Sequence, residues 1–220
     1  MVAESSEARR PRRGYESPVR RERAQRTREH VIATAATLFA EHGYAATSMR
    51  RIATEAGVGL ETVTQTGRKA DLLLAAFRSQ LADSPDAIDL TELIGMPTPG
   101  DLETTLQAAV AALAERLRDS LGIWRAFTVA AATDDTIAAV RSELAAARRR
   151  DIASWLATYE DAGMLAPRDE TARGRLADAL GLLVSHDAYD QLVGVCGWPH
   201  TDFVTWTAAA IANQLRGTHP

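Results

Sequence analysis

Apolar side chains recur at helical spacing along almost the whole chain after its first 26 residues. In the first such stretch, Ile32, Ala35, Ala36 and Phe39 are three or four residues apart, so they share one face of a helix. The alternation of apolar and polar residues that is typical of a half-buried strand does not occur. Helices without a sheet to cover must bury their apolar faces against other helices. The pattern therefore predicts an all-α protein of about nine helices.

Capping residues and glycines place the ends of these helices. Thr27 is a suitable N-cap for the first helix, and Gly43 is a suitable stop for it. Gly57 can take the left-handed conformation that ends the second helix. The predicted helices are 28–42, a second that follows residue 47 or 48, a short third within 58–67, then 69–82, 101–118, 121–132, 134–161, 169–193 and 201–215.

The chain divides by composition into two parts. Residues 83–100 contain three prolines, which favours a boundary between modules there. Residues 1–82 carry 14 Lys and Arg against 9 Asp and Glu, whereas the remainder carries 11 against 20. A basic N-terminal module next to an acidic one suits a protein that contacts a polyanion with its N-terminal part only. We expect a small domain at 27–82 and a larger one at 83–220.

The first 26 residues hold eight arginines and four glutamates with almost no aliphatic side chains. Such a segment buries too little apolar surface to fold alone, so we expect a disordered arm. The arm is either a solvated leader or a basic extension that follows a DNA backbone or enters a minor groove.

Other features concern the compartment. No apolar run approaches the ~18 residues of a membrane span, and no apolar stretch typical of a signal peptide opens the sequence. The single cysteine, Cys196, cannot form an internal disulfide. These features predict a cytoplasmic protein without a membrane partner.

Three short helices with a tight turn at Ala56, Gly57 and Val58 would form a helix-turn-helix. Residues 31–77 resemble the N-terminal domain of the tetracycline-repressor (TetR) family in more detail. The elements that carry this resemblance are Leu38, Phe39, Gly43, Tyr44, the run from Thr47 to Arg50, Ile52, Ala53, the run from Ala56 to Val58, Thr62, Val63, Leu72 and Leu73.

The resemblance implies a three-helix DNA-binding domain, followed by a helical domain that dimerises and senses a ligand. It implies a homodimer on a palindromic DNA operator, a repressor released by a small apolar effector, and no cofactor. The sequence departs from the family in its reading helix. Thr64, Thr66 and Gly67 stand where aromatic residues are common, Glu61 stands where a glycine is common, and Ala70 aligns with a usual lysine. A dimerising helical adaptor without sequence-specific DNA binding is therefore the alternative.

In a helix-turn-helix the N-terminal part of the second helix contacts base edges, while amides and cations hold phosphates. Gln65 can pair with adenine, and Glu61 can accept a hydrogen bond from cytosine N4. The amides that open the preceding helix, at Thr47 and Ser48, can meet a phosphate. The predicted DNA-binding residues are Thr47, Ser48, Arg50, Arg51, Gly59, Leu60, Glu61, Thr62, Thr64, Gln65, Arg68 and Lys69.

Aromatic residues in the second domain share helix faces, which is typical of a core and also of an apolar ligand cavity. The predicted cavity residues are Met96, Trp124, Phe127, Trp155, Tyr159, His186 and Tyr189. On the last helix an apolar stripe is the predicted dimer interface, or else packs within its own chain. The interface residues are Trp198, Phe203, Trp206 and Ala210.

Enzyme motifs are missing from the sequence. It has no phosphate-binding glycine loop, nucleophile elbow or HExxH helix, so we predict no catalytic residues. The pair His186 and Asp187 resembles the HD pair of metal phosphohydrolases, but no further ligands accompany it. A capping or solvated pair is the prediction there, with no metal.

Overall fold

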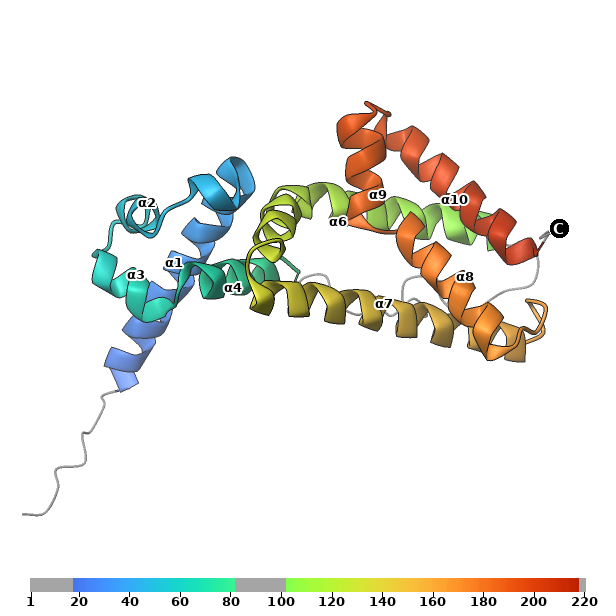
Figure 1. Ribbon diagram of the computed structural model, residues 1–220, viewed down its shortest axis with the longest axis horizontal. Helices are drawn as coiled ribbons and strands as arrows, with labels where there is room; N and C mark the ends of the chain where they lie inside the picture. The colour runs from blue at the N-terminus through green and yellow to red at the C-terminus, as the bar shows by residue number, and fades with distance from the viewer. Residues whose placement is uncertain (1–17, 82–101, 218–220) are drawn as a thin grey trace, which may run out of the picture.

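The computed structural model of the protein describes residues 18–81 and 102–217, and every regular element in these ranges is helical (Figure 1). The elements are α1 (Pro18–Ala46), α2 (Met49–Glu55), α3 (Leu60–Thr66), α4 (Lys69–Leu81), α6 (Leu102–Ala131), α7 (Asp135–Asp161), α8 (Glu170–Leu183), α9 (His186–Tyr189), the π-helix η1 (Asp190–Val195) and α10 (His200–Arg216). The predicted all-α class is confirmed.

Helices α1 to α4 form the N-terminal module at one end of the elongated molecule (Figure 1). Gly43 adopts φ 76° within α1, which ends the straight part of the helix where the sequence predicted a stop. Ser48 then caps α2 by accepting a hydrogen bond from the amide of Arg51. Gly57, with φ 64°, makes the tight turn toward α3.

The start of α1 differs from the prediction. We expected the helix to begin at Arg28, but α1 already begins at Pro18, so residues 18–26 are helical and not a disordered arm. The i, i+4 pairs of Glu22 with Arg26 and of Gln25 with Glu29 support these turns. The rest of the predicted arm, residues 1–17, lies outside the described residues.

Two long helices span the body of the molecule. We predicted a break near residue 120, but α6 is one continuous helix from Leu102 to Ala131. Within this continuous helix, Gly122 lies where α6 crosses α1 and permits close packing there. Helix α7 begins after Asp134, whose carboxylate accepts hydrogen bonds from the amides of Thr136 and Ile137.

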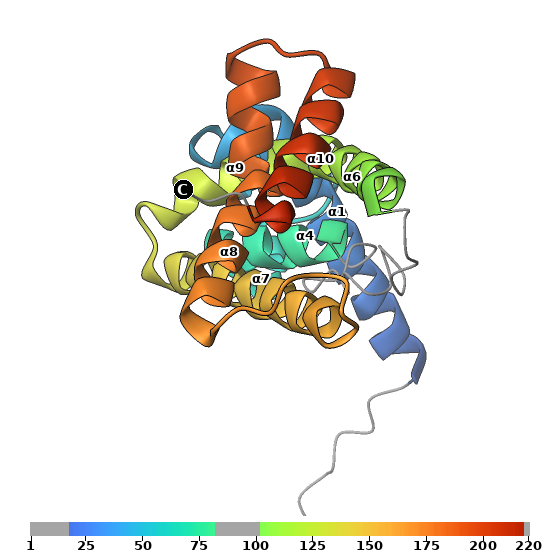
Figure 2. The same cartoon turned by 90° about the vertical axis from the view of Figure 1, so that its right-hand side faces the viewer.

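The C-terminal region differs from the prediction in one place. The expected helix 169–193 is broken after Leu183, and Ser185 caps a new helix by accepting from the amide of Ala188. This new helix, α9, continues into the π-helix η1. Figure 2 shows α9 and α10 rising side by side from the rest of the body.

Helix α6 joins the two apolar cores. Its C-terminal half packs against α1 and α4, where Phe127 stacks on Phe77 of α4 at 4.3 Å between ring centroids. Its N-terminal half packs with α7, α8 and α10 around Leu113 and Leu156. The N-terminal module and the body are therefore joined by one continuous helix.

Candidate DNA-binding helix and ligand cavity

The outward face of α3 is polar and exposed. Val63 is fully buried and anchors the helix in the core, whereas Leu60 is 42% exposed. Glu61, Thr64 and Gln65 are also exposed. Gly59 precedes the helix in an extended conformation, so the outward face begins with the first turn of α3. This is the end of a reading helix that meets base edges in a helix-turn-helix.

Hydrogen bonds along α3 leave acceptors available. The Thr64 hydroxyl donates to the carbonyl of Leu60 at 2.9 Å, and the Gln65 amide donates to the Glu61 carboxylate at 3.3 Å. Thr62 is half-buried. The face carries one carboxylate and no cation, so α3 can discriminate bases but contributes no attraction to phosphate.

Helix α2 and the two residues before it hold four of the predicted DNA-binding residues, and one of these four is buried. Thr47 is 0% exposed, and its hydroxyl donates to the carbonyls of Leu38 and Gly43. The prediction that Thr47 contacts DNA is therefore wrong, because the residue ties α1 to α2 inside the module. Ser48 and Arg50 are exposed, and Arg51 is half-exposed beside His42, 2.7 Å from its Nε2.

The two cations after α3 are already engaged. Arg68 donates from Nε and Nη2 to both carboxylate oxygens of Asp71, at 3.1 and 3.2 Å. This fork lowers the pKa of Asp71 and raises that of Arg68. Lys69 lies 4.2 Å from the ring centroid of Tyr44, a cation–π contact, and partial burial lowers its pKa. Both cations hold the module together, which limits what they offer to phosphate.

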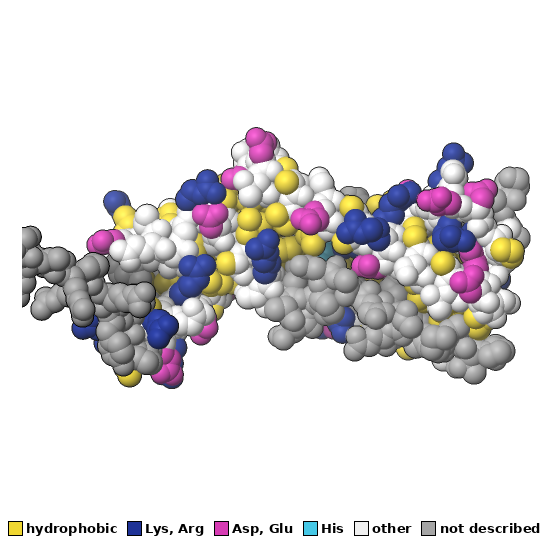
Figure 3. Space-filling model, turned by 90° about the horizontal axis from the view of Figure 1, so that it is seen from below, with side chains coloured by type: hydrophobic (Ala, Val, Ile, Leu, Met, Phe, Trp, Pro, Cys, Tyr) yellow, Lys and Arg dark blue, Asp and Glu magenta, His cyan; other side chains and the backbone are white. Residues whose placement is uncertain are grey.

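Free positive charge lies instead on the extension of α1. Arg20, Arg21, Arg23 and Arg28 are exposed, and the extension projects beyond α2 and α3 (Figure 1). Arg28 donates to the carbonyl of Thr66 at 2.9 Å, which joins the extension to the end of the reading helix. On the face seen in Figure 3, basic and acidic side chains are interspersed along the molecule.

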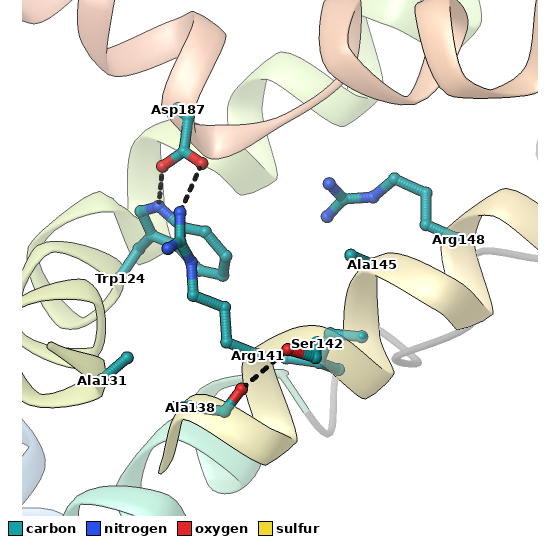
Figure 4. A pocket seen from close by; sticks show the side chains of 9 residues that line it. Trp124, Ala131, Ala138, Arg141, Ser142, Ala145, Arg148 and Asp187 are labelled. Atoms are coloured by element: carbon teal, nitrogen blue, oxygen red, sulfur yellow. Dashed lines mark hydrogen bonds and ion pairs between the residues drawn. The ribbon is translucent and has the colours of Figure 1, made fainter. Parts of the chain in front are cut away.

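A cavity of about 350 Å³ lies between α6, α7 and α9 (Figure 4). Asp187 of α9 stands at one side of it, where its carboxylate accepts from Trp124 Nε1 at 2.8 Å and from Arg141 at 3.1 Å. The lining residues are Trp124, Ala131, Ala138, Arg141, Ser142, Leu144, Ala145, Arg148 and Asp187.

The cavity only partly coincides with the predicted ligand residues. Trp124 lines it. Phe127 lies in the core shared with the DNA-binding module, and Trp155, Tyr159 and Tyr189 lie in the core of the body. Those four residues are therefore packing residues, which corrects their assignment to the lining, and Met96 lies outside the described residues.

His186 lies behind the cavity lining and packs against Trp124. The imidazole is buried, stacks on Trp124 at 4.6 Å between centroids, and lies 2.8 Å from Ser120 Oγ. Burial, together with the nearby charge of Arg148, lowers its pKa to about 4, so the ring is neutral at pH 7. Its assignment to the lining is also corrected, since it positions Trp124 instead.

Sequence reasoning missed the arginines of the cavity. Arg141 and Arg148 are seven residues apart on α7, so they share a helix face with Ala138 and Ala145. This spacing was a usable signal. The predicted apolar character of the cavity is correspondingly wrong, because its lining includes two guanidinium groups and a carboxylate.

The carboxylates near His186 are engaged in ion pairs. Asp187 pairs with Arg141 and Asp190 pairs with Arg125. Within residues 18–81 and 102–217, no three His, Cys, Asp or Glu side chains are grouped as metal ligands. In the same part of the chain, no helix is long and apolar enough to cross a bilayer.

The predicted dimer stripe is divided by the fold. Phe203 is buried and packs edge-on against Tyr189 of its own chain, 4.9 Å between centroids, so its assignment to a dimer interface is wrong. Trp206 is 44% exposed and lies edge-on to the half-buried Trp198 at 5.6 Å. Ala210 is half-buried on the same helix.

A helix-turn-helix with an exposed reading face on an all-helical body defines a class of DNA-binding transcriptional regulators. Residues 31–66 match the family model for the bacterial regulatory proteins of the tetR family. Over these residues the chain matches the tetR family of bacterial regulatory proteins, and its described residues share the fold of solved structures assigned as TetR-family regulators. Among curated proteins, no sequence matches the chain.

Solved structures share the fold over most of the chain. A protein from Pseudomonas aeruginosa PAO1, assigned as a transcriptional regulator, is 22% identical with a TM-score of 0.66, covering 94% of this chain and 96% of its own. A TetR transcription regulator from Haloarcula marismortui ATCC 43049 is 16% identical with a TM-score of 0.63, covering 87% and 97%. A protein from Saccharomonospora viridis, assigned as a transcriptional regulator and solved in complex with choline, is 20% identical with a TM-score of 0.67, covering 86% and 96%.

Proposed function

We propose that the protein is a repressor that binds a palindromic operator as a homodimer and releases it when a small effector occupies the cavity. The observation that carries this proposal is the outward face of α3. Its exposed side chains are held by a buried anchor, Val63, in the position of a reading helix.

Reading and holding of DNA are divided between different elements. Glu61 and Gln65 supply base contacts, where a well-made pair discriminates by roughly 1–3 kcal/mol. Because α3 carries no cation, attraction to phosphate comes from the exposed arginines of the α1 extension and from Arg50. Affinity then depends on salt through the extension, while sequence preference depends on α3.

Dimerisation uses the exposed C-terminal surface. Trp206 and Trp198 form an aromatic pair on it, and Val195 is 70% exposed nearby on η1. Burial of apolar side chains of this size by a second copy of the chain would stabilise a dimer. A twofold arrangement of this surface would present two reading helices to one DNA face, ~34–36 Å apart.

Effector control acts through α6. Trp124 forms the wall of the cavity, and Gly122, one half-turn away on the same helix, touches α1 of the DNA-binding module. A ligand that shifts α6 therefore shifts the reading head. The solved relative with choline supports a ligand role for this fold, although choline itself is a cation and this cavity holds two arginines. Release follows if the effector binds the arrangement that fits DNA poorly.

The test is selection of bound duplexes from random sequences at two salt concentrations. It uses the full chain and a truncation that begins at Ala24, which lacks Arg20, Arg21 and Arg23. We expect enrichment of a palindrome by both proteins, with weaker binding and a shallower salt dependence for the truncation. Absence of any enriched sequence would contradict the proposal and favour the helical adaptor.

A further inference from the structure

Arg148 is the unusual group of the cavity. It extends from α7 into the cavity, and Figure 4 draws no bond from it to any neighbouring residue. Among the described residues no carboxylate or carbonyl pairs with its guanidinium, although seven other arginines of the body form ion pairs with carboxylates. Burial lowers its pKa, and the ring of the neutral His186 lies close by. A partly buried cation without a partner is costly, because desolvation is not offset.

The one carboxylate of the cavity is already used. Asp187 accepts from Trp124 with one oxygen and from Arg141 with the other. Asp187 therefore acts on Arg148 only through its charge at longer range. This charge raises the pKa of Arg148, in opposition to the larger lowering by burial. With two guanidinium groups and one carboxylate, the lining carries an excess positive charge that favours an anion.

Apart from Ser142, the remaining lining is apolar. Three alanines and Leu144 face the cavity beside the indole of Trp124. A volume of about 350 Å³ lies at the small end of the range for ligand cavities, roughly 300–1,000 Å³. The space suits a compact molecule with one charged end and one apolar end.

We propose that the effector is a small organic carboxylate whose charged end pairs with Arg148 and whose apolar body lies against Trp124 and the alanine wall. This rests on the proposed effector function of the cavity. A guanidinium and a carboxylate form two parallel charge-assisted hydrogen bonds, which gives both strength and orientation. Neutral analogues lose this pair, and cations are repelled by it.

The experiment is calorimetric titration of the full-length protein without DNA. The probes are benzoate, phenylacetate and hexanoate, each beside its neutral primary amide, with acetate as the anion that lacks an apolar body. We expect at least one of the three acids to bind at least tenfold more tightly than its amide and than acetate. Equal binding of acid and amide, or no binding by any of the three acids, would overturn the proposal.

Two matched variants identify the site. Arg148→Gln should lose at least tenfold in affinity for the acid, while Arg148→Lys should retain part of it because the charge stays. Arg149→Gln is the control, since Arg149 is the adjacent residue on α7 but pairs with Asp178 outside the cavity. Unchanged affinity in Arg148→Gln, with the fold verified by circular dichroism, would also overturn the proposal.

DNA binding is measured separately on the same preparations. If the protein binds an acid through Arg148 but binds no DNA, the ligand class stands and the repressor function fails. If it binds an operator but none of the acids, the ligand class fails and the repressor function stands.

Discussion

Gly122 of α6 lies directly against the backbone of Ala40 of α1. A Cβ atom at residue 122 would stand 2.8 Å from the Ala40 carbonyl oxygen, closer than such atoms approach in proteins, and 3.1 Å from the Ala40 Cβ, which is also unusually close. The contact brings the body and the DNA-binding module together at the helix that also carries Trp124. The absence of a side chain at residue 122 is what permits this approach.

Replacing Gly122 with alanine tests that contact. The added methyl group meets backbone, so α1 and α6 must move apart, and we expect the free energy of unfolding to fall by roughly 1–3 kcal/mol. Gly181→Ala is the matched control, because that helical glycine leaves ordinary contact distances of 3.6 and 3.8 Å to its neighbours. There the better helix propensity of alanine should leave stability equal or raise it by up to ~1 kcal/mol. Urea denaturation measures the free energy of unfolding of both variants. Equal stability of the two variants would contradict the close contact.

Stability should fall as the pH is lowered from about 6.5 to 4. His186 has a folded-state pKa of about 4, below the 6.5 of an unperturbed histidine, so the unfolded chain binds its proton first as the pH falls. The loss amounts to roughly 3 kcal/mol for a shift of this size and levels off below pH 4. The groups facing the ring are Ser120, Trp124, Arg148 and Asp187.

The comparison protein for this pH dependence is His186→Gln, measured by denaturant unfolding at each pH. It should be less stable at pH 7 but show a flatter profile between pH 6.5 and 4. Parallel profiles for the two proteins would show that His186 is not the titrating group.

Glu61→Gln should raise DNA affinity while weakening base preference. The substitution removes a negative charge from the reading face, and it exchanges an acceptor for an amide that no longer selects cytosine N4. We expect several-fold tighter binding to all duplexes and a relaxed preference at one position of each half-site. Glu55→Gln, at an exposed acid of α2, should leave base preference unchanged. Competition binding with single-base operator variants measures both; a preference unaltered in Glu61→Gln would exclude the cytosine contact.

Asp71→Asn should free Arg68 for phosphate. In the wild type both oxygens of Asp71 are bonded to the Arg68 side chain. The neutral amide holds it less tightly, so we expect higher DNA affinity and a salt slope steeper by about one unit. The double variant with Arg68→Gln should lose this gain, which a double-mutant cycle detects. If the gain persists in the double variant, it arises from the lost charge of Asp71 alone.

If the proposed dimer forms through α10, Trp206→Glu should convert it into a monomer. A charge in place of an exposed indole opposes burial by a second copy. Val129→Glu serves as control, because Val129 is 56% exposed but lies on α6, away from the proposed interface. Sedimentation equilibrium of the three proteins reports the masses. A Trp206→Glu variant that keeps the mass of the wild type would place the interface elsewhere.

Local patterns predicted most of the helices and the reading face. Helical spacing placed α2, α3, α4 and α7 within a few residues, because periodicity, caps and glycine stops act within one turn of the chain. The same patterns placed the start of α1 too late and predicted a break in α6 that does not occur. They also predicted one helix through Leu183, where the structure has a break. Gly122 lies inside a predicted helix, but its role in helix crossing depends on Ala40, a partner about eighty residues away.

The sequence by itself determined that this chain is helical, that its N-terminal part holds a helix-turn-helix, and that Glu61 and Gln65 lie on the third helix, which we propose as the reading helix. Only the tertiary structure decided that Thr47 and Phe203 are interior, and that Arg148 extends into a cavity. The reason is physical. Spacing along a helix says which side chains share a face, but which neighbour covers that face depends on packing between residues far apart in the chain.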